Sequence, residues 1–318
     1  MDIIKELSLI GIVPVIAIND ASDASPLADA LCRGGLPCAE VTFRTDAAEE
    51  AIGIMKKSHP DMIVGAGTVL TAEQADRAAG AGASFIVSPG LNPDVVSHCI
   101  SRDYPIVPGC ATPSDIERAI SLGLDTVKFF PAEAAGGIGM IRAMSAPYSK
   151  MRFMPTGGIK ASNLNDYLSF RKVFACGGSW MASSKLISDG DFERIENLTR
   201  EAVDSMLDLS VHHVGINSDA SHADGIASEF SSLFGFEKRP TDISVWSGDM
   251  IEVMSGTARG EVGHIAFATN YVDRAAYHLT RRGMRFDESS AKYDASGEMT
   301  FIYAENVVGG FAVHLIKR

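Results

Sequence analysis

The stretch Thr126-Val-Lys-Phe-Phe-Pro-Ala-Glu133 opens on a short apolar, β-branched run, and seven similar runs are spaced along the first 180 or so residues. Helical patterns, such as 26–35, 47–59 and 113–123, fill the gaps between them. Eight alternating units of nearly continuous apolar strand and helix favour a (β/α)8 TIM barrel over an open doubly wound sheet. The predicted strands are 12–18, 38–44, 62–69, 85–90, 106–111, 126–132, 152–158 and 173–180.

Lys128 lies inside the quoted stretch, where a charged ammonium is costly to bury. A strand can accommodate such a lysine by pairing it with a carboxylate, by letting it reach solvent, or by lowering its pKa until it is a neutral amine. Only the neutral amine attacks a ketone to form a Schiff base, whose iminium draws electrons from the adjacent carbon–carbon bond. The segment alone favours a paired or solvent-reaching lysine, so the choice depends on the rest of the chain.

Polar residues gather within or just after the predicted strands, mostly toward their carboxyl ends. Barrel enzymes build their active sites at that face. The clustering therefore indicates function more than structure. These residues are Glu40, Arg44, Thr68, Ser88, Lys128, Thr156 and Ser179.

Strand alternation places Glu40 and Lys128 where both can point into the barrel. Schiff-base chemistry needs a proton shuttle, and Glu40 is the candidate acid/base; the alternative is a plain salt-bridge partner for the lysine. The Arg44 guanidinium matches the two oxygens of a keto acid's carboxylate, which Thr68 and Thr156 could also hold. The alternative for Arg44 is an ion pair at the rim.

Two glycine pairs follow the seventh and eighth predicted strands, in Pro155-Thr-Gly-Gly-Ile159 and Cys176-Gly-Gly-Ser-Trp180. Small residues let backbone N–H groups approach an anion, and barrel phosphate sites favour these two loops. One such pair is more often a plain tight turn. Two pairs at both expected strand ends predict a phosphate site, to which Ser179 adds a hydroxyl.

The composition is that of a soluble globular protein, with 318 residues, 46% of them hydrophobic, and room for about two domains. The net charge of −12 argues against a nucleic acid or an anionic membrane as partner. No targeting signal or spanning segment is visible. The five scattered cysteines form no CxxC pair, which predicts reduced thiols and a cytoplasmic location. They are Cys32, Cys38, Cys99, Cys110 and Cys176.

A domain boundary is expected near 208–211, after a helical pattern over 191–209. The predicted domains are 1–208 and 211–318. The second repeats itself, because His213-Val-Gly-Ile and His264-Ile-Ala-Phe each open a strand followed by a helix and further strands. Two βαβββ units of an α+β domain are predicted.

Residues 1–208 resemble the 2-keto-3-deoxy-6-phosphogluconate (KDPG) aldolase family. The motifs that carry the resemblance occur in family order, and they are Gly11-Ile-Val-Pro-Val-Ile, Glu40-Val-Thr-Phe-Arg-Thr, Val64-Gly-Ala-Gly-Thr-Val-Leu, Ser88-Pro-Gly, Val127-Lys-Phe-Phe-Pro-Ala-Glu, Pro155-Thr-Gly-Gly-Ile and Gly177-Gly-Ser-Trp. The resemblance implies a class I, metal-independent lyase of the Entner-Doudoroff pathway, usually a homotrimer. Such an enzyme splits KDPG to pyruvate and glyceraldehyde 3-phosphate, and often also cleaves 4-hydroxy-2-oxoglutarate (KHG) to pyruvate and glyoxylate.

The same resemblance assigns roles by motif. Lys128 becomes the Schiff-base lysine and Glu40 the acid/base, while Arg44, Thr68 and Thr156 hold the pyruvyl carboxylate. Pro89 and Phe130 line the pocket, and the phosphate ligands are Gly157, Gly158, Gly178 and Ser179. Ser179 resembles the gluconate branch of the family more than the galactonate branch.

The second domain resembles the vicinal-oxygen-chelate (glyoxalase/bleomycin-resistance) family, in which four strand positions converge on one divalent metal. The matching residues are His213, Glu252, His264 and His314. Imidazole and oxygen ligands suit zinc, nickel, manganese or iron(II). His314 stands where glyoxalases usually have glutamate. His212 is expected to face away from His213 by strand alternation.

Other interpretations stay open at this point. The barrel could be a phosphate-binding isomerase, which needs a base but no nucleophilic lysine, or an aldolase of another sugar acid. The second domain could be the main working part, as a metal-dependent lyase, dioxygenase or sensor. It could also be an ancestral fold kept for assembly or stability.

Overall fold

The computed structural model describes residues 2–256 and 258–318, and the chain divides into two compact units. The first unit ends at Met206, and the second is Leu207–Arg318. Among the described residues, no helix is both long enough and apolar enough to cross a membrane.

Eight parallel strands form the centre of the first unit, in the order β7-β6-β5-β4-β3-β2-β1-β8. Bridges from Phe153 to Val173 and from Thr156 to Gly177 join β7 to the β8 side and close the ring. The strands are β1 Ile12–Ile16, β2 Cys38–Thr42, β3 Ile63–Gly67, β4 Phe85–Ser88, β5 Ile106–Cys110, β6 Thr126–Phe129, β7 Arg152–Pro155 and β8 Cys176–Gly178. The predicted barrel is confirmed, and each strand is shorter than its apolar run.

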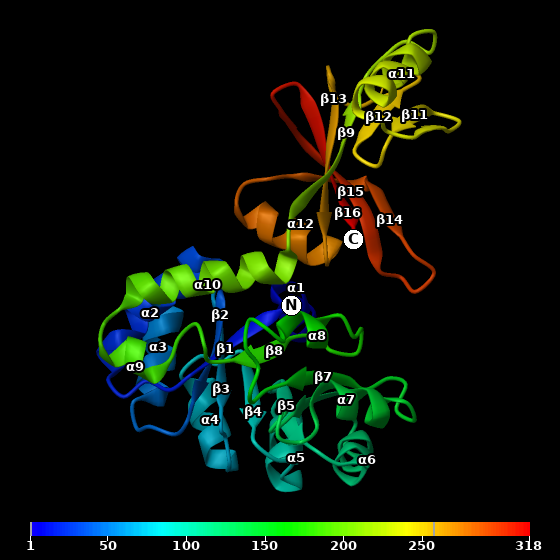
Figure 1. Ribbon diagram of the computed structural model, residues 1–318. Coiled ribbons are helices and arrows are strands. Elements are labelled where there is room, and N and C mark those ends of the chain that lie inside the picture. Colours follow the sequence, from blue (N-terminus) through cyan, green and yellow to red (C-terminus); the bar gives the residue numbers. More distant parts are fainter. Residues whose placement is uncertain (1, 257) are drawn as a thin grey trace. The chain divides into compact units, whose positions relative to one another are not determined.

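Helices surround this ring of strands (Figure 1). Local signals fix their ends: Asp2 caps the first helix and Gly11 (φ 79°) ends it, while Thr112 and Asp115 form a capping box at Pro113. The helices are α1 Ile3–Ile10, α2 Ala24–Gly34, α3 Ala48–Ser58, α4 Ala72–Gly80, α5 Pro93–Ser101, α6 Pro113–Ser121, α7 Gly137–Ser145, α8 Leu164–Leu168, α9 Ser184–Ser188 and α10 Phe192–Leu207, with the 3₁₀ turn η1 Ala21–Asp23.

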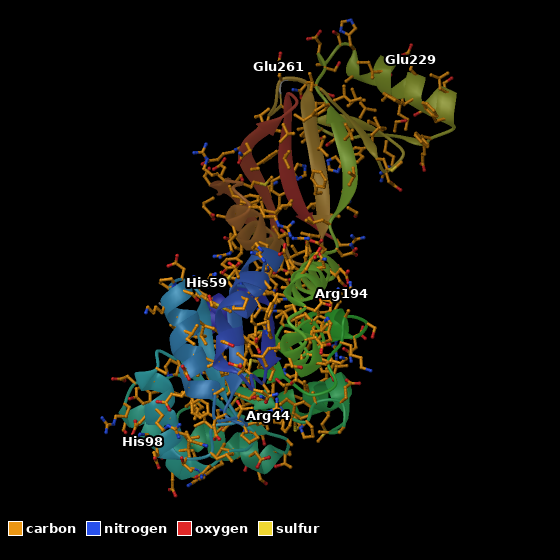
Figure 2. The ribbon with its side chains drawn as sticks, turned by 90° about the vertical axis from the view of Figure 1, so that its left-hand side faces the viewer. Arg44, His59, His98, Arg194, Glu229 and Glu261 are labelled. Carbon is orange, nitrogen blue, oxygen red and sulfur yellow. The ribbon has the colours of Figure 1, made fainter. Side chains whose placement is uncertain are left out.

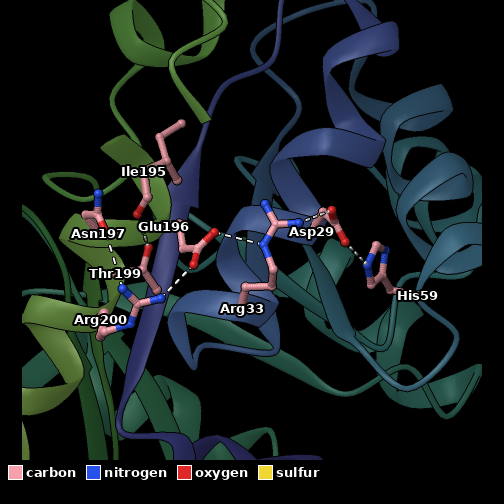
Figure 3. A network of polar contacts seen from close by, with 8 residues as sticks. All are labelled: Asp29, Arg33, His59, Ile195, Glu196, Asn197, Thr199 and Arg200. Atoms are coloured by element: carbon pink, nitrogen blue, oxygen red, sulfur yellow. Dashed lines mark hydrogen bonds and ion pairs between the residues drawn. The ribbon is translucent and has the colours of Figure 1, made fainter. Parts of the chain in front are cut away.

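Helix α10 packs against α2, where Gly34 meets Thr199. A Cβ on Gly34 would lie 2.5 Å from Thr199 Cβ, so only glycine permits this approach. Ion pairs run alongside, from Glu196 to Arg33 and on through Asp29 to His59 (Figure 3). Ion pairs between solvent-accessible side chains add little to stability, so the apolar packing holds α10 in place.

The second unit consists of two βαβββ repeats, as predicted, in one eight-stranded sheet. Its first repeat is β9 Ser210–Ile216, α11 Ala223–Phe234, β10 Lys238–Pro240, β11 Ser244–Ser247 and β12 Ile251–Met254. The second is β13 Gly263–Thr269, α12 Val272–Arg281, β14 Phe286–Tyr293, β15 Met299–Val308 and β16 Phe311–Lys317.

The sheet order β10-β11-β12-β9-β13-β16-β15-β14 reflects the repeat. The first strands of the two repeats, β9 and β13, pair antiparallel at the centre (Figure 1), and each also pairs parallel with the last strand of its own repeat. The four central strands are therefore β12, β9, β13 and β16. Each carries one of the four predicted metal ligands.

Candidate functional site

A pocket of about 360 Å³ in the barrel brings together all eleven site residues that were predicted for this unit. Most of them stand within two residues of a strand's carboxyl end, where turns leave side chains free to face the barrel mouth. The pocket is lined by Val15, Glu40, Thr42, Arg44, Thr68, Pro89, Lys128, Phe130, Thr156, Gly157, Gly158, Ile159, Gly177, Gly178 and Ser179.

Lys128 and Glu40 meet inside the barrel, although 88 residues separate them. Lys128 on β6 donates from Nζ to Glu40 Oε1 on β2 over 3.0 Å, and the side chains are 6% and 0% exposed. The second carboxylate oxygen, Glu40 Oε2, is buried without a hydrogen-bond partner. The pair thus keeps one acceptor free for a proton from a ligand.

Two glycines for which no packing role was predicted from the sequence make this packing possible. A Cβ on Gly67 would stand 2.7 Å from Glu40 Cγ and closer still to Oε1. A Cβ on Gly177 would overlap the Thr156 hydroxyl, which is itself buried and unpartnered. The sequence could have indicated this role, since a glycine inside a predicted strand often marks a place where another group approaches the backbone closely.

Arg44 comes from the segment that directly follows β2 (Figure 2) and is exposed at the pocket's rim. Its Nε donates to Thr42 Oγ1 over 3.1 Å, and Thr42 Oγ1 donates to the Ile16 carbonyl over 2.8 Å. No role for Thr42 was predicted from the sequence. This chain of bonds fixes the base of the guanidinium and leaves its terminal nitrogens for a ligand.

Thr68 lines the same pocket with φ at 57°, a conformation that β-branched residues rarely adopt. Such a backbone costs about 1–3 kcal/mol and occurs mostly at functional sites. The observation favours a functional role for Thr68.

Contacts from two neighbouring segments hold the loop of Gly157 and Gly158. Glu133 donates its backbone N–H to the Gly157 carbonyl over 3.0 Å, and Asn163 donates to the Gly158 carbonyl over 3.2 Å. The Glu133 carboxylate accepts a hydrogen bond from Tyr167, a buried residue of α8. Both glycines have φ near 90°, so the tight turn depends on them.

The pocket has a buried floor and solvent-exposed outer residues. Lys128, Glu40 and Thr156 at its floor are buried, whereas Arg44, Gly158 and Ser179 are exposed. A ligand would therefore have its reacting carbon in a dry environment and an anionic end near solvent.

The second unit gathers His213, His264 and His314, all buried, with ligand nitrogens within 4.8 Å of one another. They come from β9, β13 and β16, and register places them on one face of the sheet. Gly215 leaves the space for this, because a Cβ there would overlap the His264 ring. The Nδ1 atoms of His264 and His314 are buried without a partner.

Glu252 on β12 completes the group. Its Oε2 lies 3.4 Å from His213 Nε2 and 3.2 Å from His264 Nε2, while Oε1 accepts from the Ser244 hydroxyl over 2.7 Å. Burial raises the pKa of the Glu252 carboxyl, but hydrogen bonds from both histidines and Ser244 outweigh this and lower it strongly. Burial, with the two neighbouring histidines, lowers the pKa of His314 to about 3. A carboxylate and a neutral imidazole are the forms that bind a divalent ion, so the donor set fits one.

His212 was expected to be a surface histidine that faces away from His213, and only the second part of this expectation was wrong. His212 is exposed, but its Nδ1 lies 2.8 Å from His213 Nδ1. The register of β9 against β13 shifts at this point, where His213 faces Ala266 and Val211 faces Phe267. The bulge leaves His212 outside the ladder, so strict alternation fails there.

The parallel barrel, with a buried lysine and carboxylate in its pocket, places the chain among the barrel enzymes. The family model described as "KDPG and KHG aldolase" matches residues 3–198, and the chain belongs to this family of aldolases, which are lyases. It is 48% identical over 202 residues to the 2-dehydro-3-deoxy-phosphogluconate aldolase of Haemophilus influenzae, over 64% of this chain and 95% of the relative.

Two solved structures are similar to the barrel. One is the KDPG aldolase of Zymomonas mobilis with 3-phosphoglycerate, at 41% identity and a TM-score of 0.59, covering 63% of this chain and 93% of that one. The other is the KDPG aldolase of Legionella pneumophila with pyruvate captured as a covalent carbinolamine, at 36% identity and a TM-score of 0.61, covering 63% and 97%. Both matches span the barrel's share of the chain.

Proposed function

We propose that the barrel is a class I aldolase that cleaves KDPG to pyruvate and glyceraldehyde 3-phosphate, and KHG to pyruvate and glyoxylate. The observation that carries the proposal is the buried contact of 3.0 Å between Lys128 Nζ and Glu40 Oε1, next to an unpartnered carboxylate oxygen. The names of the relatives support the substrate, and the covalent pyruvate adduct of the Legionella pneumophila enzyme supports the chemistry.

In the proposed mechanism Lys128 passes a proton to Glu40 and attacks the ketone at C2, and a second proton moves from its nitrogen to the ketone oxygen to form the carbinolamine. Glu40 returns the proton to the carbinolamine hydroxyl, which leaves as water and yields the iminium. Glu40 then takes the proton of the C4 hydroxyl. The C3–C4 bond breaks, its electron pair moves toward the iminium to give an enamine, and the aldehyde departs. Protonation of C3 and hydrolysis release pyruvate and restore the amine.

The ends of the substrate are assigned by the family motifs. Arg44, Thr68 and Thr156 would hold the carboxylate, for which Thr156 offers an unpartnered hydroxyl. Pro89 and Phe130 would pack against the carbon chain. Backbone N–H groups of Gly157, Gly158 and Gly178, with the Ser179 hydroxyl, would hold the phosphate.

Trapping with pyruvate and borohydride tests the assignment. Reduction of the iminium should add one covalent three-carbon adduct, which peptide mass spectrometry should locate on Lys128. The exposed Lys160 and Lys185 serve as internal controls. An adduct on either of them, or none at all, would contradict the proposed nucleophile.

For the second unit we propose a divalent metal site made of His213, Glu252, His264 and His314. The proposal is supported by the convergence of three buried imidazoles with a carboxylate that its partners keep ionised. A metal held there would supply a Lewis acid. The four residues would hold the ion, and Ser244 would orient the Glu252 carboxylate.

Elemental analysis tests this second proposal. Protein purified without chelator should carry up to one divalent ion per chain, whereas the double variant His213→Ala, His264→Ala should carry almost none. Aldolase activity should survive chelator treatment in both proteins, because the proposed iminium provides the electrophile without a metal. A full-length protein that takes up no ion at sub-millimolar concentration would contradict the metal site.

A further inference from the structure

The pocket around the histidine cluster is far larger than one metal ion requires. Its volume is about 550 Å³, and its walls combine three aromatic rings with two cationic side chains. The rings belong to Trp246, Phe301 and Tyr303. The space and the lining are those of a site for a small organic ligand.

The two cationic side chains stand on rings that pack against His314. Lys292 Nζ lies 4.9 Å from the centre of the Phe301 ring, and that ring is 4.6 Å from the His314 ring. Arg259 lies 4.5 Å from the centre of the Tyr303 ring, which is 5.0 Å from the His314 ring. The Phe301 and Tyr303 rings therefore lie between the two positive charges and the histidine cluster. The separation is roughly the length of a short carbon chain.

The charges in this wall do not cancel. Arg259 pairs with Asp287 over 2.6 Å, but within the described part of the chain the Lys292 ammonium has neither an ion pair nor a hydrogen bond. Glu252 is the one carboxylate among the lining residues, and its oxygens are engaged by His213, His264 and Ser244. The Lys292 ammonium is therefore available to pair with a negative charge on a ligand.

We propose that this pocket binds a small 2-oxo or 2-hydroxy acid with a second anionic group, whose adjacent oxygens meet the metal while Lys292 holds the distant anion. The inference rests on the proposed metal site. Two adjacent oxygens suit a divalent ion held by imidazole and carboxylate, and an ammonium on an aromatic wall suits a carboxylate or phosphate. KDPG and KHG belong to the same chemical class, so the second unit would recognise molecules related to those handled by the barrel.

Cobalt spectroscopy on the full-length protein tests the inference. The visible absorption of bound Co²⁺ reports on ligands entering its coordination sphere, and binding in the barrel does not affect it. We expect 2-oxoglutarate to change the spectrum at concentrations at least fivefold lower than pyruvate, which lacks the second anion. Lys292→Ala should weaken the 2-oxoglutarate response about fivefold, the scale of one partly exposed charge contact, and change the pyruvate response less than twofold.

Two further variants sharpen the result. Lys292→Glu should weaken the 2-oxoglutarate response more than Lys292→Ala does, because it replaces attraction by repulsion. Lys238→Ala is the matched control, since Lys238 belongs to the same unit, pairs with Asp224 and lies outside the pocket lining. It should behave as the parent.

The outcomes distinguish a failure of the metal site from a failure of the organic-ligand site. A protein that binds no Co²⁺ overturns the metal site and the ligand inference together. A protein that binds Co²⁺, but responds equally to both acids or is indifferent to Lys292→Glu, keeps the metal site and overturns the ligand inference.

Discussion

Gly67→Ala should disable the aldolase without replacing a reacting group. The added Cβ would stand 2.7 Å from Glu40 Cγ and 2.8 Å from Cδ, whereas non-bonded carbons need about 3.5–4.0 Å. Glu40 must therefore withdraw by about 1 Å. The contact with Lys128, now 3.0 Å, would lengthen beyond hydrogen-bonding reach.

A displacement of this size costs about 10²-fold in turnover, or about 2.7 kcal/mol of transition-state stabilisation. We expect kcat for KDPG cleavage to fall by that factor, and the rate of borohydride trapping on Lys128 to fall with it. Gly80→Ala is the matched control, since no atom lies within 4 Å of the added Cβ. It should leave kcat unchanged.

A compensating change separates crowding from general damage to the barrel. Glu40→Asp shortens the side chain by one methylene, so it should lower kcat in the parent yet raise it in the Gly67→Ala background. This reversal of sign is the coupling expected of residues in contact. A folded Gly67→Ala protein with kcat within about threefold of the parent would refute the reasoning, as would a double variant weaker than both singles.

Three other predictions test the site and the fold. Glu40→Gln should keep the fold and lower kcat by about 10²-fold or more in a steady-state assay, and a near-normal rate would leave Glu40 as an ion-pair partner. Ser179→Ala with Gly158→Ala should raise KM for KDPG but spare KHG, which has no phosphate; equal losses would contradict the phosphate map. Burial raises the pKa of Asp115, but hydrogen bonds from Ala111 and Thr112 outweigh it, so the net pKa lies below 3.8. Asp115→Asn should therefore cost about 1 kcal/mol in urea unfolding at neutral pH and less as the pH falls below 3.8, and a pH-independent cost would contradict this linkage.

The barrel was predictable because each apolar run is a strand buried on both faces. The ends of the strands were not. The strand predicted over 126–132 ends at Phe129, although the next residues are also apolar. Phe130 lines the pocket. Hydropathy cannot distinguish a buried strand residue from a buried loop residue that lines a site.

The proposed catalytic pair was predictable in kind, because strand alternation placed an acid and a lysine in the same interior. The distance between the two side chains was not predictable, since 88 residues and the curvature of the sheet separate them. Gly67 and Gly177 illustrate this limit of the sequence. The sequence displays two glycines, but only the packed barrel shows that each leaves space for a polar group on the neighbouring strand.

Buried polar atoms are normally hydrogen-bonded, so the exceptions point to function. Among the described residues, five buried side-chain atoms lack a partner. Two of them, on Glu40 and Thr156, line the barrel pocket, and two more, on His264 and His314, line the histidine pocket. The fifth, Asn217 Oδ1, lines neither pocket. The same physical criterion supports a ligand site in both units, including the one that the aldolase family model does not cover.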